Sequence, residues 1–295
     1  METLNRIEAL IGGDVARLMR RHHTDLTEVR LRAGRAPQLV WTGGEALSGE
    51  AIEVDRLREI VAALMDYSIY ARESELNQGY FTMNDGSRVG VCGRFARDAD
   101  QWRLTEIGAC CVRVARPVPG CADSLMGHIS GPSGPQSTLI LSRPGMGKTT
   151  LLRDIARQLS ESGRRVGLAD ERHELAACRM GAPTLDVGPR TDAMDGCPRP
   201  LAISTMVRAM APEVIAADEI GGPGDAEALA DAARCGVAVM ATAHAENIRA
   251  ALNRPLLAEA LQGGAFQIIV LLGNRPGEIR EIRSTDGGGI AWKSA

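Results

Sequence analysis

The chain has few aromatic residues and little net charge, and both features limit the classes of function that it can have. Its 295 residues include three each of Trp, Tyr and Phe, and the formal net charge is −3. Base stacking requires aromatic side chains, and phosphate-backbone contacts require cationic ones. This composition argues against a nucleic-acid motor, and we expect no nucleic-acid partner.

The chain also lacks paired cysteine motifs and long hydrophobic runs. Its seven cysteines are an odd number without a C-x-x-C pair, which is typical of free thiols in a reducing compartment. The best uncharged apolar run, at 266–273, has the length of a strand, whereas a membrane span needs about 18 residues. The N-terminus lacks the apolar region of a signal peptide. We expect a cytoplasmic protein, or one that reaches a membrane through a partner.

What the chain does have is enough apolar material for two domains, since 44% of its residues are hydrophobic. Residues 130–137 combine Gly, Pro, Ser and Gln without a large apolar side chain, which is typical of a linker. We therefore predict an N-terminal domain over 1–130, a linker over 131–137 and a second domain over 138–295.

The N-terminal domain is predicted to be a small α+β domain. Hydrophobic periodicity predicts one helix over 5–21 and another after Asp55, its expected N-cap. Alternating residues at 28–32 predict a half-buried strand, and the NDG sequence at 84–86 predicts a hairpin turn. Further strands are expected at 79–83, 88–92 and 111–115.

The second domain shows a strand–helix–strand order. Short apolar runs predict strands that are buried on both faces of a largely parallel sheet: 138–141, 166–169, 214–217, 237–240 and 267–272. Helices are expected between them at 149–161, 200–210 and 225–235. The fold class is therefore α/β, a mostly parallel sheet with flanking helices.

A glycine-rich sequence follows the first of these strands and precedes a helix. It reads Ser142-Arg-Pro-Gly-Met-Gly-Lys-Thr149, a P-loop pattern with Ser in place of the first glycine. In such a loop Lys148 reaches the β- and γ-phosphates and Thr149 ligates Mg²⁺, so ATP and Mg²⁺ are the expected cofactors. The predicted nucleotide-binding residues are Ser142, Pro144, Gly145, Met146, Gly147, Lys148, Thr149 and Thr150.

The strand at 214–217 ends in two acids, as a Walker B strand does. We assign Asp218 to the metal and Glu219 to activation of the attacking water. Two other predicted strands also end in polar residues, Asp170-Glu171-Arg172 and Thr242-Ala243-His244. The carboxyl ends of parallel strands meet at one edge of a sheet, so the acids and the histidine there could face the γ-phosphate.

These features resemble the secretion-type ATPases of type II and type IV systems, which have a RecA-like core. Within that superfamily the chain is most similar to the stage III sporulation protein AA family. The similar stretches run through nearly the whole chain: 28–32, 86–94, 111–116, 142–154, 166–178, 190–198, 210–221 and 241–248. The segment 221–225 has no arginine where many secretion ATPases carry one, which leaves a sensor role there in doubt.

The resemblance carries expectations about assembly and about further site residues. It implies a hexameric ring in the mother cell that works with membrane-embedded sporulation or secretion channel proteins. It maps the catalytic acid of the Asp box onto Glu171 and the catalytic histidine of the His box onto His244. It also points to an arginine finger from the N-terminal domain. The candidate arginines are Arg88, Arg94, Arg113 and Arg116, with Arg190 in the second domain.

Three other functions compete with an ATP hydrolase that energises a channel complex. One is a nucleotide-gated assembly component with little turnover, although Glu219 would then have no use. Another is a nucleic-acid motor, because a RecA-like core is shared among functions. A small-molecule kinase is a weaker alternative, since no lid or acceptor site is evident.

Overall fold

The computed structural model divides into two compact units, Met1–Arg116 and Pro117–Ala295, and each is described by itself. The structure describes residues 2–67, 73–77, 79–83, 85–98, 101–115, 118–131, 134–178, 180–285 and 292–294. Two predicted features fall partly outside these ranges, Asn84 of the hairpin turn and residues 132–133 of the linker.

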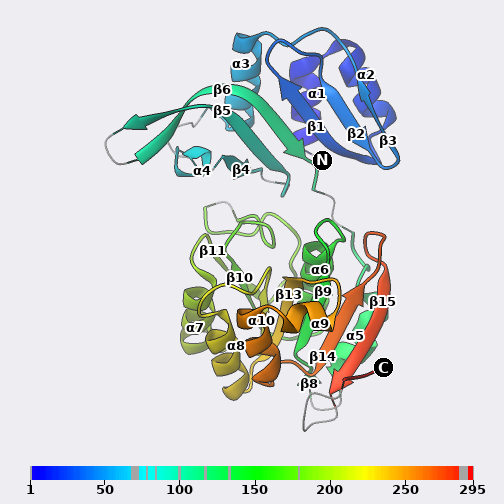
Figure 1. The fold of residues 1–295 in the computed structure, drawn as a ribbon, viewed down its shortest axis with the longest axis vertical. Coiled ribbons are helices and arrows are strands. Elements are labelled where there is room, and N and C mark those ends of the chain that lie inside the picture. The colour runs from blue at the N-terminus through cyan, green and yellow to red at the C-terminus, as the bar shows by residue number, and fades with distance from the viewer. Residues whose placement is uncertain are drawn as a thin grey trace. The chain divides into compact units, whose positions relative to one another are not determined.

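Unit 1 is an antiparallel sheet with helices on one face (Figure 1). The strand order is β3-β2-β1-β6-β5-β4. Val29 and Leu31 of β1 and Val112 of β6 are fully buried against helical residues such as Leu57 and Ile60, and this forms the core of unit 1. Its elements are α1 (Glu2–Ile11), α2 (Gly13–Arg21), β1 (Leu26–Arg32), β2 (Gln38–Trp41), β3 (Gly44–Leu47), α3 (Val54–Leu64), α4 (Glu73–Asn77), β4 (Tyr80–Thr82), β5 (Arg88–Asp98) and β6 (Gln101–Arg113).

Two predictions for unit 1 need correction. The single helix predicted over 5–21 is two helices. Gly12 and Gly13 have positive φ angles of 69° and 58°, so α1 ends before them and α2 begins in a new direction. Strands β5 and β6 are longer than the predicted 88–92 and 111–115, since they continue as a two-stranded arm. The arm is charged and largely exposed, so it shows little of the apolar alternation on which strand prediction depends.

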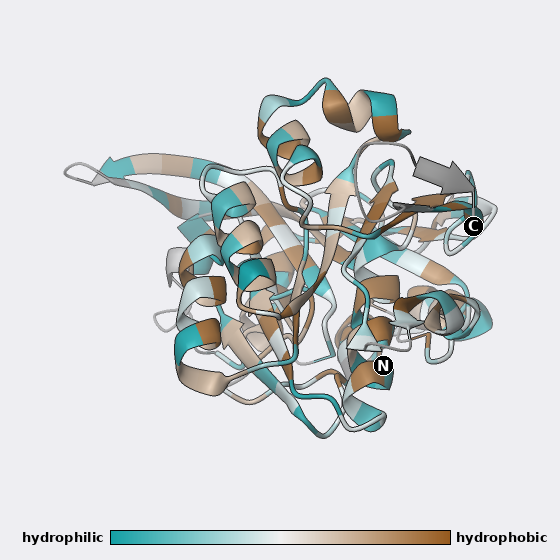
Figure 2. Cartoon of the chain, turned by 90° about the horizontal axis from the view of Figure 1, so that it is seen from below, coloured by the Kyte–Doolittle hydropathy of each residue, from teal (hydrophilic) through white to brown (hydrophobic). Residues whose placement is uncertain are grey.

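Unit 2 is a three-layer α/β fold in which the predicted strands form the centre of one sheet. Its strand order is β11-β10-β12-β13-β9-β14-β15-β16, parallel from β11 to β14 and antiparallel beyond. Hydrophobic ribbon is concentrated in these strands and on the helix faces that flank them (Figure 2). The elements are α5 (Asp123–Ile129), β7 (Ser130–Gly131), β8 (Gly134–Pro135), β9 (Thr138–Ser142), α6 (Lys148–Glu161), β10 (Val166–Asp170), β11 (Thr191–Asp195), α7 (Arg199–Met210), β12 (Val214–Ala217), α8 (Asp225–Arg234), β13 (Ala238–His244), α9 (Ile248–Leu252), α10 (Pro255–Gln262), β14 (Ile268–Leu272), β15 (Ile279–Thr285) and β16 (Trp292–Ser294).

The boundary between the units lies before α5, whereas the sequence placed a linker at 131–137, after it. Helix α5 belongs to unit 2 because Leu125 and Ile129 are fully buried in a core cluster with Ile140 of β9 and Leu152 of α6. The small polar residues that suggested a linker instead form the short β7–β8 pair.

The parallel strands place four polar strand ends side by side. Strands β9, β13, β12 and β10 are consecutive neighbours, and they are buried along their lengths except for the half-buried His244 at the carboxyl end of β13. Strand β11 was not predicted because its sequence, TDAMD, is polar, which an edge strand tolerates.

Among the described residues, no helix is both long enough and apolar enough to cross a bilayer.

Candidate functional site

The loop between β9 and α6 holds the Lys148 side chain at the edge of the sheet. Gly145 and Gly147 have positive φ angles of 77° and 87°, which let the loop turn sharply into the first residue of α6. The Lys148 Nζ donates hydrogen bonds to the Ser142 hydroxyl and the Arg143 carbonyl, both at 3.2 Å. It also lies 3.0 Å from Nδ1 of His244, at the end of β13.

No carboxylate contacts this ammonium group within the part of the chain that the structure describes. Lys148 is 5% exposed, and its burial lowers the pKa of its ammonium group, while the charge of Asp218 opposes that shift. A buried cation with only neutral partners is unusual, because charged groups inside proteins are normally paired. The loop therefore has the electrostatics of an anion site, with its cation already in place.

The hydroxyl and carboxylate oxygens expected at a Mg²⁺ site do come together. The Thr149 hydroxyl donates to Oδ2 of Asp218 at 2.6 Å, which joins α6 to the end of β12. The other carboxylate oxygen, Oδ1, accepts a hydrogen bond from the Thr242 hydroxyl of β13. Because Thr242 is fully buried, it fixes the direction in which Asp218 presents its carboxylate.

Glu219 lies beside this pair in an unusual backbone conformation. Its φ angle is 54°, a left-handed value that is uncommon outside glycine, and its backbone N–H donates to the Thr242 hydroxyl at 2.8 Å. Its Oε1 lies 2.8 Å from Nε2 of His244, and its Oε2 accepts a hydrogen bond from the Arg172 guanidinium group. Both carboxylate oxygens are therefore engaged.

His244 joins Lys148 to Glu219 as a neutral imidazole. Burial, and then the charge of Lys148, lower the pKa of His244, which favours the uncharged ring at neutral pH. The two partners assign the tautomer, because Nδ1 must accept from the ammonium group while Nε2–H donates to the carboxylate. Lys148, His244, Glu219 and Arg172 thus form one connected chain of side chains.

The acids after β10 have other partners. Asp170 is buried and accepts hydrogen bonds from the backbone N–H groups of residues 174–176, so it shapes the following loop. Oε2 of Glu171 lies 3.0 Å from the Arg199 guanidinium group, which also bonds Asp225 at 2.7 Å. Among the described residues, the Glu171 carboxylate therefore pairs with Arg199 and lies outside the series of contacts from Lys148 to Arg172.

The remaining P-loop residues contribute mainly backbone. Pro144 and Gly145 are exposed, and a Cβ on Gly145 would meet nothing within 4 Å. The Met146 carbonyl accepts a hydrogen bond from the Gly277 N–H at 3.0 Å, which ties the loop to the β14–β15 turn. The Thr150 carbonyl lies 3.8 Å from Sγ of Cys121.

The predicted arginines of unit 1 lie on its helix-free sheet face or on its arm. Arg113 of β6 pairs in register with Arg88 of β5 and with Glu28 of β1, and its Nε is 3.8 Å from Glu28. Arg88 stacks on Tyr80 at 3.8 Å. Arg94, on the arm, lies 3.8 Å from Glu106. Arg116 lies outside the described residues.

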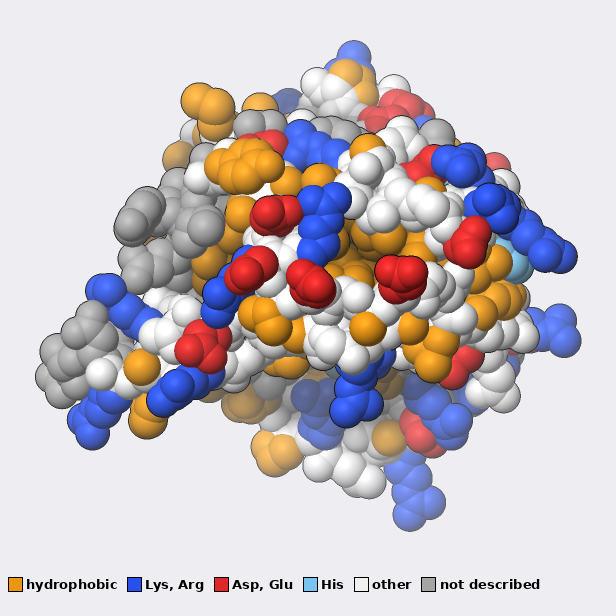
Figure 3. Space-filling view, turned by 90° about the horizontal axis from the view of Figure 1, so that it is seen from above, with side chains coloured by type: hydrophobic (Ala, Val, Ile, Leu, Met, Phe, Trp, Pro, Cys, Tyr) orange, Lys and Arg blue, Asp and Glu red, His pale blue; other side chains and the backbone are white. Residues whose placement is uncertain are grey.

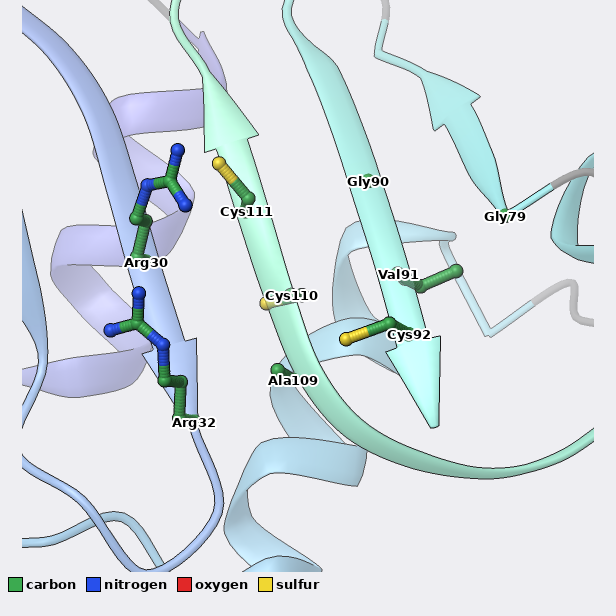
Figure 4. A pocket seen from close by; sticks show the side chains of 9 residues that line it. All are labelled: Arg30, Arg32, Gly79, Gly90, Val91, Cys92, Ala109, Cys110 and Cys111. Atoms are coloured by element: carbon green, nitrogen blue, oxygen red, sulfur yellow. The ribbon is translucent and has the colours of Figure 1, made fainter. Parts of the chain in front are cut away.

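The same sheet face holds a cavity of about 240 Å³ beside Arg30 and Arg32 of β1 (Figure 4). Both side chains stand on the near face in that view, with the helices behind the sheet. Its other lining residues are small or sulfur-containing, Cys111 and Cys92 among them.

On the face of the molecule shown in Figure 3, acidic and basic side chains are interspersed.

Arg190 lies at the end of unit 2 opposite to the P-loop. It directly precedes β11, and its Nη1 donates to the Ser160 carbonyl at 3.2 Å. Ser160 is in the last turn of α6, whose first residue is Lys148. A helix of 14 residues is about 20 Å long, so Arg190 cannot reach the P-loop of its own chain.

The residues at the strand ends fit a nucleotide and Mg²⁺. Mg²⁺ prefers oxygen ligands and is usually held by one or two carboxylates with substrate phosphates and water. Thr149 and Asp218 supply such oxygens, and Lys148 supplies the cation for the phosphates. Among the described residues there is no cluster of three or more His, Cys, Asp or Glu that could hold a metal ion by itself.

Comparisons with solved structures define the class of fold. The ATPase DotB of Legionella pneumophila aligns with a TM-score of 0.61 at 15% identity, covering 92% of this chain and 81% of DotB. The pilus retraction motor PilT with bound ADP aligns with a TM-score of 0.60 at 14% identity, covering 96% of this chain and 82% of PilT. The fold is therefore that of the RecA-like secretion ATPases, as the sequence predicted.

Sequence comparisons define the family. The family model "Sporulation stage III, protein AA" matches residues 1–290. Stage III sporulation protein AA of Bacillus subtilis is 36% identical over 272 residues, which are 89% of this chain and 88% of that protein. The chain belongs to the stage III sporulation protein AA family. It is also 30% identical to SEEDLING PLASTID DEVELOPMENT 1 of Arabidopsis thaliana over 268 residues, but spans only 36% of that protein.

Sequence reasoning missed Thr242 and Arg172 as members of the site. Both follow strands whose ends were predicted to be polar, close in sequence to the predicted site residues His244 and Glu171. Thr242 carries a usable signal, because it lies two residues before His244 and therefore on the same side of β13. Nothing in the sequence shows that Arg172, and not Glu171, contacts Glu219.

We expect Thr242→Val to lower the free energy of unfolding by about 1–3 kcal/mol, because it leaves Asp218 Oδ1 and the Glu219 N–H without their buried partner. Thr242→Ser, which keeps the hydroxyl group, is the matched control and should cost less. Urea denaturation of the three proteins measures the difference. Equal stability of the Val and Ser variants would contradict this account of the Walker B strand.

Proposed function

We propose that this chain is an ATP hydrolase that assembles into a ring and energises a membrane channel or secretion complex during endospore formation. The observation that carries the proposal is the buried Lys148 ammonium group, which has neutral partners and faces the Thr149–Asp218 pair. The same fold occurs in an ATPase and in a motor with bound ADP, and the family is named for sporulation. The mother cell is the proposed location, and a hexamer with membrane-embedded partners is the proposed assembly.

Each residue of the site has a separate role in the proposed reaction. Lys148 binds the β- and γ-phosphates, while the loop around Gly145 and Gly147 brings backbone N–H groups to the phosphates. Thr149 and Asp218 would hold Mg²⁺, which would supply positive charge against the phosphates. Glu219 accepts the proton of the attacking water, and His244 connects this base to the phosphate-binding cation, because its ring contacts both Glu219 and Lys148.

Glu171 is a supporting acid in this proposal. Its contact with Arg199 connects the end of β10 to Asp225 at the start of α8, which in turn accepts hydrogen bonds from the Gly221 and Gly222 N–H groups. That connection steadies the loop directly after Glu219.

A second candidate, a nucleotide-gated assembly component with little turnover, has one observation in its favour. Both carboxylate oxygens of Glu219 already contact side chains, Arg172 and His244. In the isolated chain, neither oxygen is therefore free to accept a proton from water. Light scattering with and without ATP and Mg²⁺, combined with a turnover assay, separates the two functions. A nucleotide-dependent ring without hydrolysis would favour the second.

Lys148→Ala and Glu219→Gln should separate binding from hydrolysis. Lys148→Ala should abolish ATP binding, because it removes the cation that faces the phosphates. Glu219→Gln should bind ATP normally but turn over about 10²-fold more slowly or worse, since an amide cannot accept the water's proton. Calorimetry and a phosphate-release assay measure the two effects.

Glu213→Gln is the matched control for the second variant, because Glu213 precedes the same strand at its opposite end and pairs with Arg164 at 2.9 Å. Normal ATP affinity in Lys148→Ala would refute the P-loop assignment. Unchanged turnover in Glu219→Gln would move the base elsewhere.

Hydrolysis should depend on an arginine from a neighbouring subunit's unit 1, since phosphoryl-transfer sites gain about 10³–10⁵-fold from such a cation. Arg113→Ala and Lys148→Ala proteins, each inactive alone, should recover part of the activity when mixed into common rings. Arg94→Ala and Arg88→Ala test the other candidates in the same way. Arg17→Ala, which removes an exposed arginine of unit 1 that pairs with Asp14, is the control and should be active alone. Absence of recovery in rings shown to be mixed would exclude sharing between subunits.

A further inference from the structure

Arg172 is one of the two residues whose side chains occupy the Glu219 carboxylate in this structure. It follows β10, and its Nη1 donates to Oε2 of Glu219, while Nε2 of His244 occupies Oε1 at 2.8 Å. A carboxylate takes a proton from water through a lone pair that faces that water. With an imidazole on one oxygen and a guanidinium group on the other, Glu219 has to lose a partner before it can serve the proposed reaction.

Of the groups around Glu219, Arg172 is the one that is free to move away. The Glu219 backbone is fixed by its bond to the buried Thr242 hydroxyl. His244 is held from both sides, because Arg254 donates to its carbonyl at 2.6 Å and its Nδ1 contacts Lys148. The Arg172 side chain is 50% exposed. Among the described residues, its hydrogen bond and its ion pair are both to Glu219.

The neighbouring acid does not compete for Arg172. The Glu171 carboxylate pairs with Arg199, whose side chain is only 6% exposed and is anchored by Asp225. An Arg172 guanidinium group that leaves Glu219 therefore needs a different anion. The anion site beside Lys148 offers such a place, and Arg172 is separated from it by one imidazole ring and one carboxylate group.

We propose that Arg172 exchanges Glu219 for the terminal phosphate of ATP, and that this exchange frees Glu219 to accept the proton of the attacking water. The inference rests on the proposed function, because it requires ATP at the P-loop. It adds a cation from the same subunit to the site and makes the availability of the base depend on the γ-phosphate. ADP lacks that phosphate and leaves the Arg172–Glu219 pair intact.

The exchange predicts that Arg172 distinguishes ATP from ADP in binding. Calorimetry with a non-hydrolysable ATP analogue and with ADP, each with Mg²⁺, measures both affinities without turnover. Arg172→Ala should weaken binding of the analogue about tenfold or more, because a charge-assisted hydrogen bond is lost, and should leave ADP binding unchanged. Arg172→Lys, which keeps the charge, should recover part of the discrimination, and Arg172→Gln checks that an uncharged side chain of similar size does not.

Arg234→Ala is the matched control, an exposed arginine at the end of α8 that pairs with Asp231. Equal affinities of the wild-type and Arg172→Ala proteins for the analogue would overturn the exchange. So would an equal loss for the analogue and ADP, or faster turnover in Arg172→Ala with unchanged affinities, since Arg172 would then only restrain Glu219. If the wild-type chain binds neither nucleotide, the proposed function itself fails, which is a distinct result.

Discussion

The arrangement of unit 2 depends on one desolvated cation, the ammonium group of Lys148. A lysine at the first position of a helix is also unfavourable for the helix dipole, whose positive end lies there. The chain offsets neither cost with a carboxylate contact, since the partners of Nζ among the described residues are carbonyl, hydroxyl and imidazole groups. An arrangement of this kind is stabilised by an incoming anion, and phosphate binding at a helix N-terminus follows from the same electrostatics.

The acids of the site are arranged so that they do not neutralise this cation. Asp218 is turned toward the hydroxyl groups of Thr149 and Thr242, and Glu219 is turned toward His244 and Arg172. The neutral imidazole of His244 stands between Lys148 and Glu219 and contacts both. A direct Lys148–Glu219 ion pair would close the anion site, so the imidazole keeps the opposite charges apart while it connects them.

Most of the central sheet could be predicted because its strands are buried on both faces and therefore read as short apolar runs, as in VIAA at 214–217. The edge strand β11 could not be predicted, because its sequence is mostly polar and carries no apolar run. A strand at the edge of a sheet is partly exposed and tolerates such residues. Likewise, α5 was assigned to the wrong side of the boundary because nothing local reveals that Leu125 packs on Leu152 of a later helix. That Lys148, Asp218 and His244 lie at one edge of the sheet was predictable from their positions at strand ends. The contacts of Arg172, Thr242 and Glu171 were not, because they depend on which side chains meet across neighbouring strands.

Lysine-selective NMR is the most direct test of the central claim, because the chain has only two lysines, Lys148 and Lys293. In a Lys293→Arg protein with ¹³C-labelled lysine, a single side-chain signal reports on Lys148. The account predicts a pKa below the ordinary lysine value without nucleotide, because burial lowers it, and a rise in that pKa when ATP and Mg²⁺ bring phosphate oxygens to the ammonium group. A signal with an ordinary lysine pKa that does not respond to ATP would contradict it.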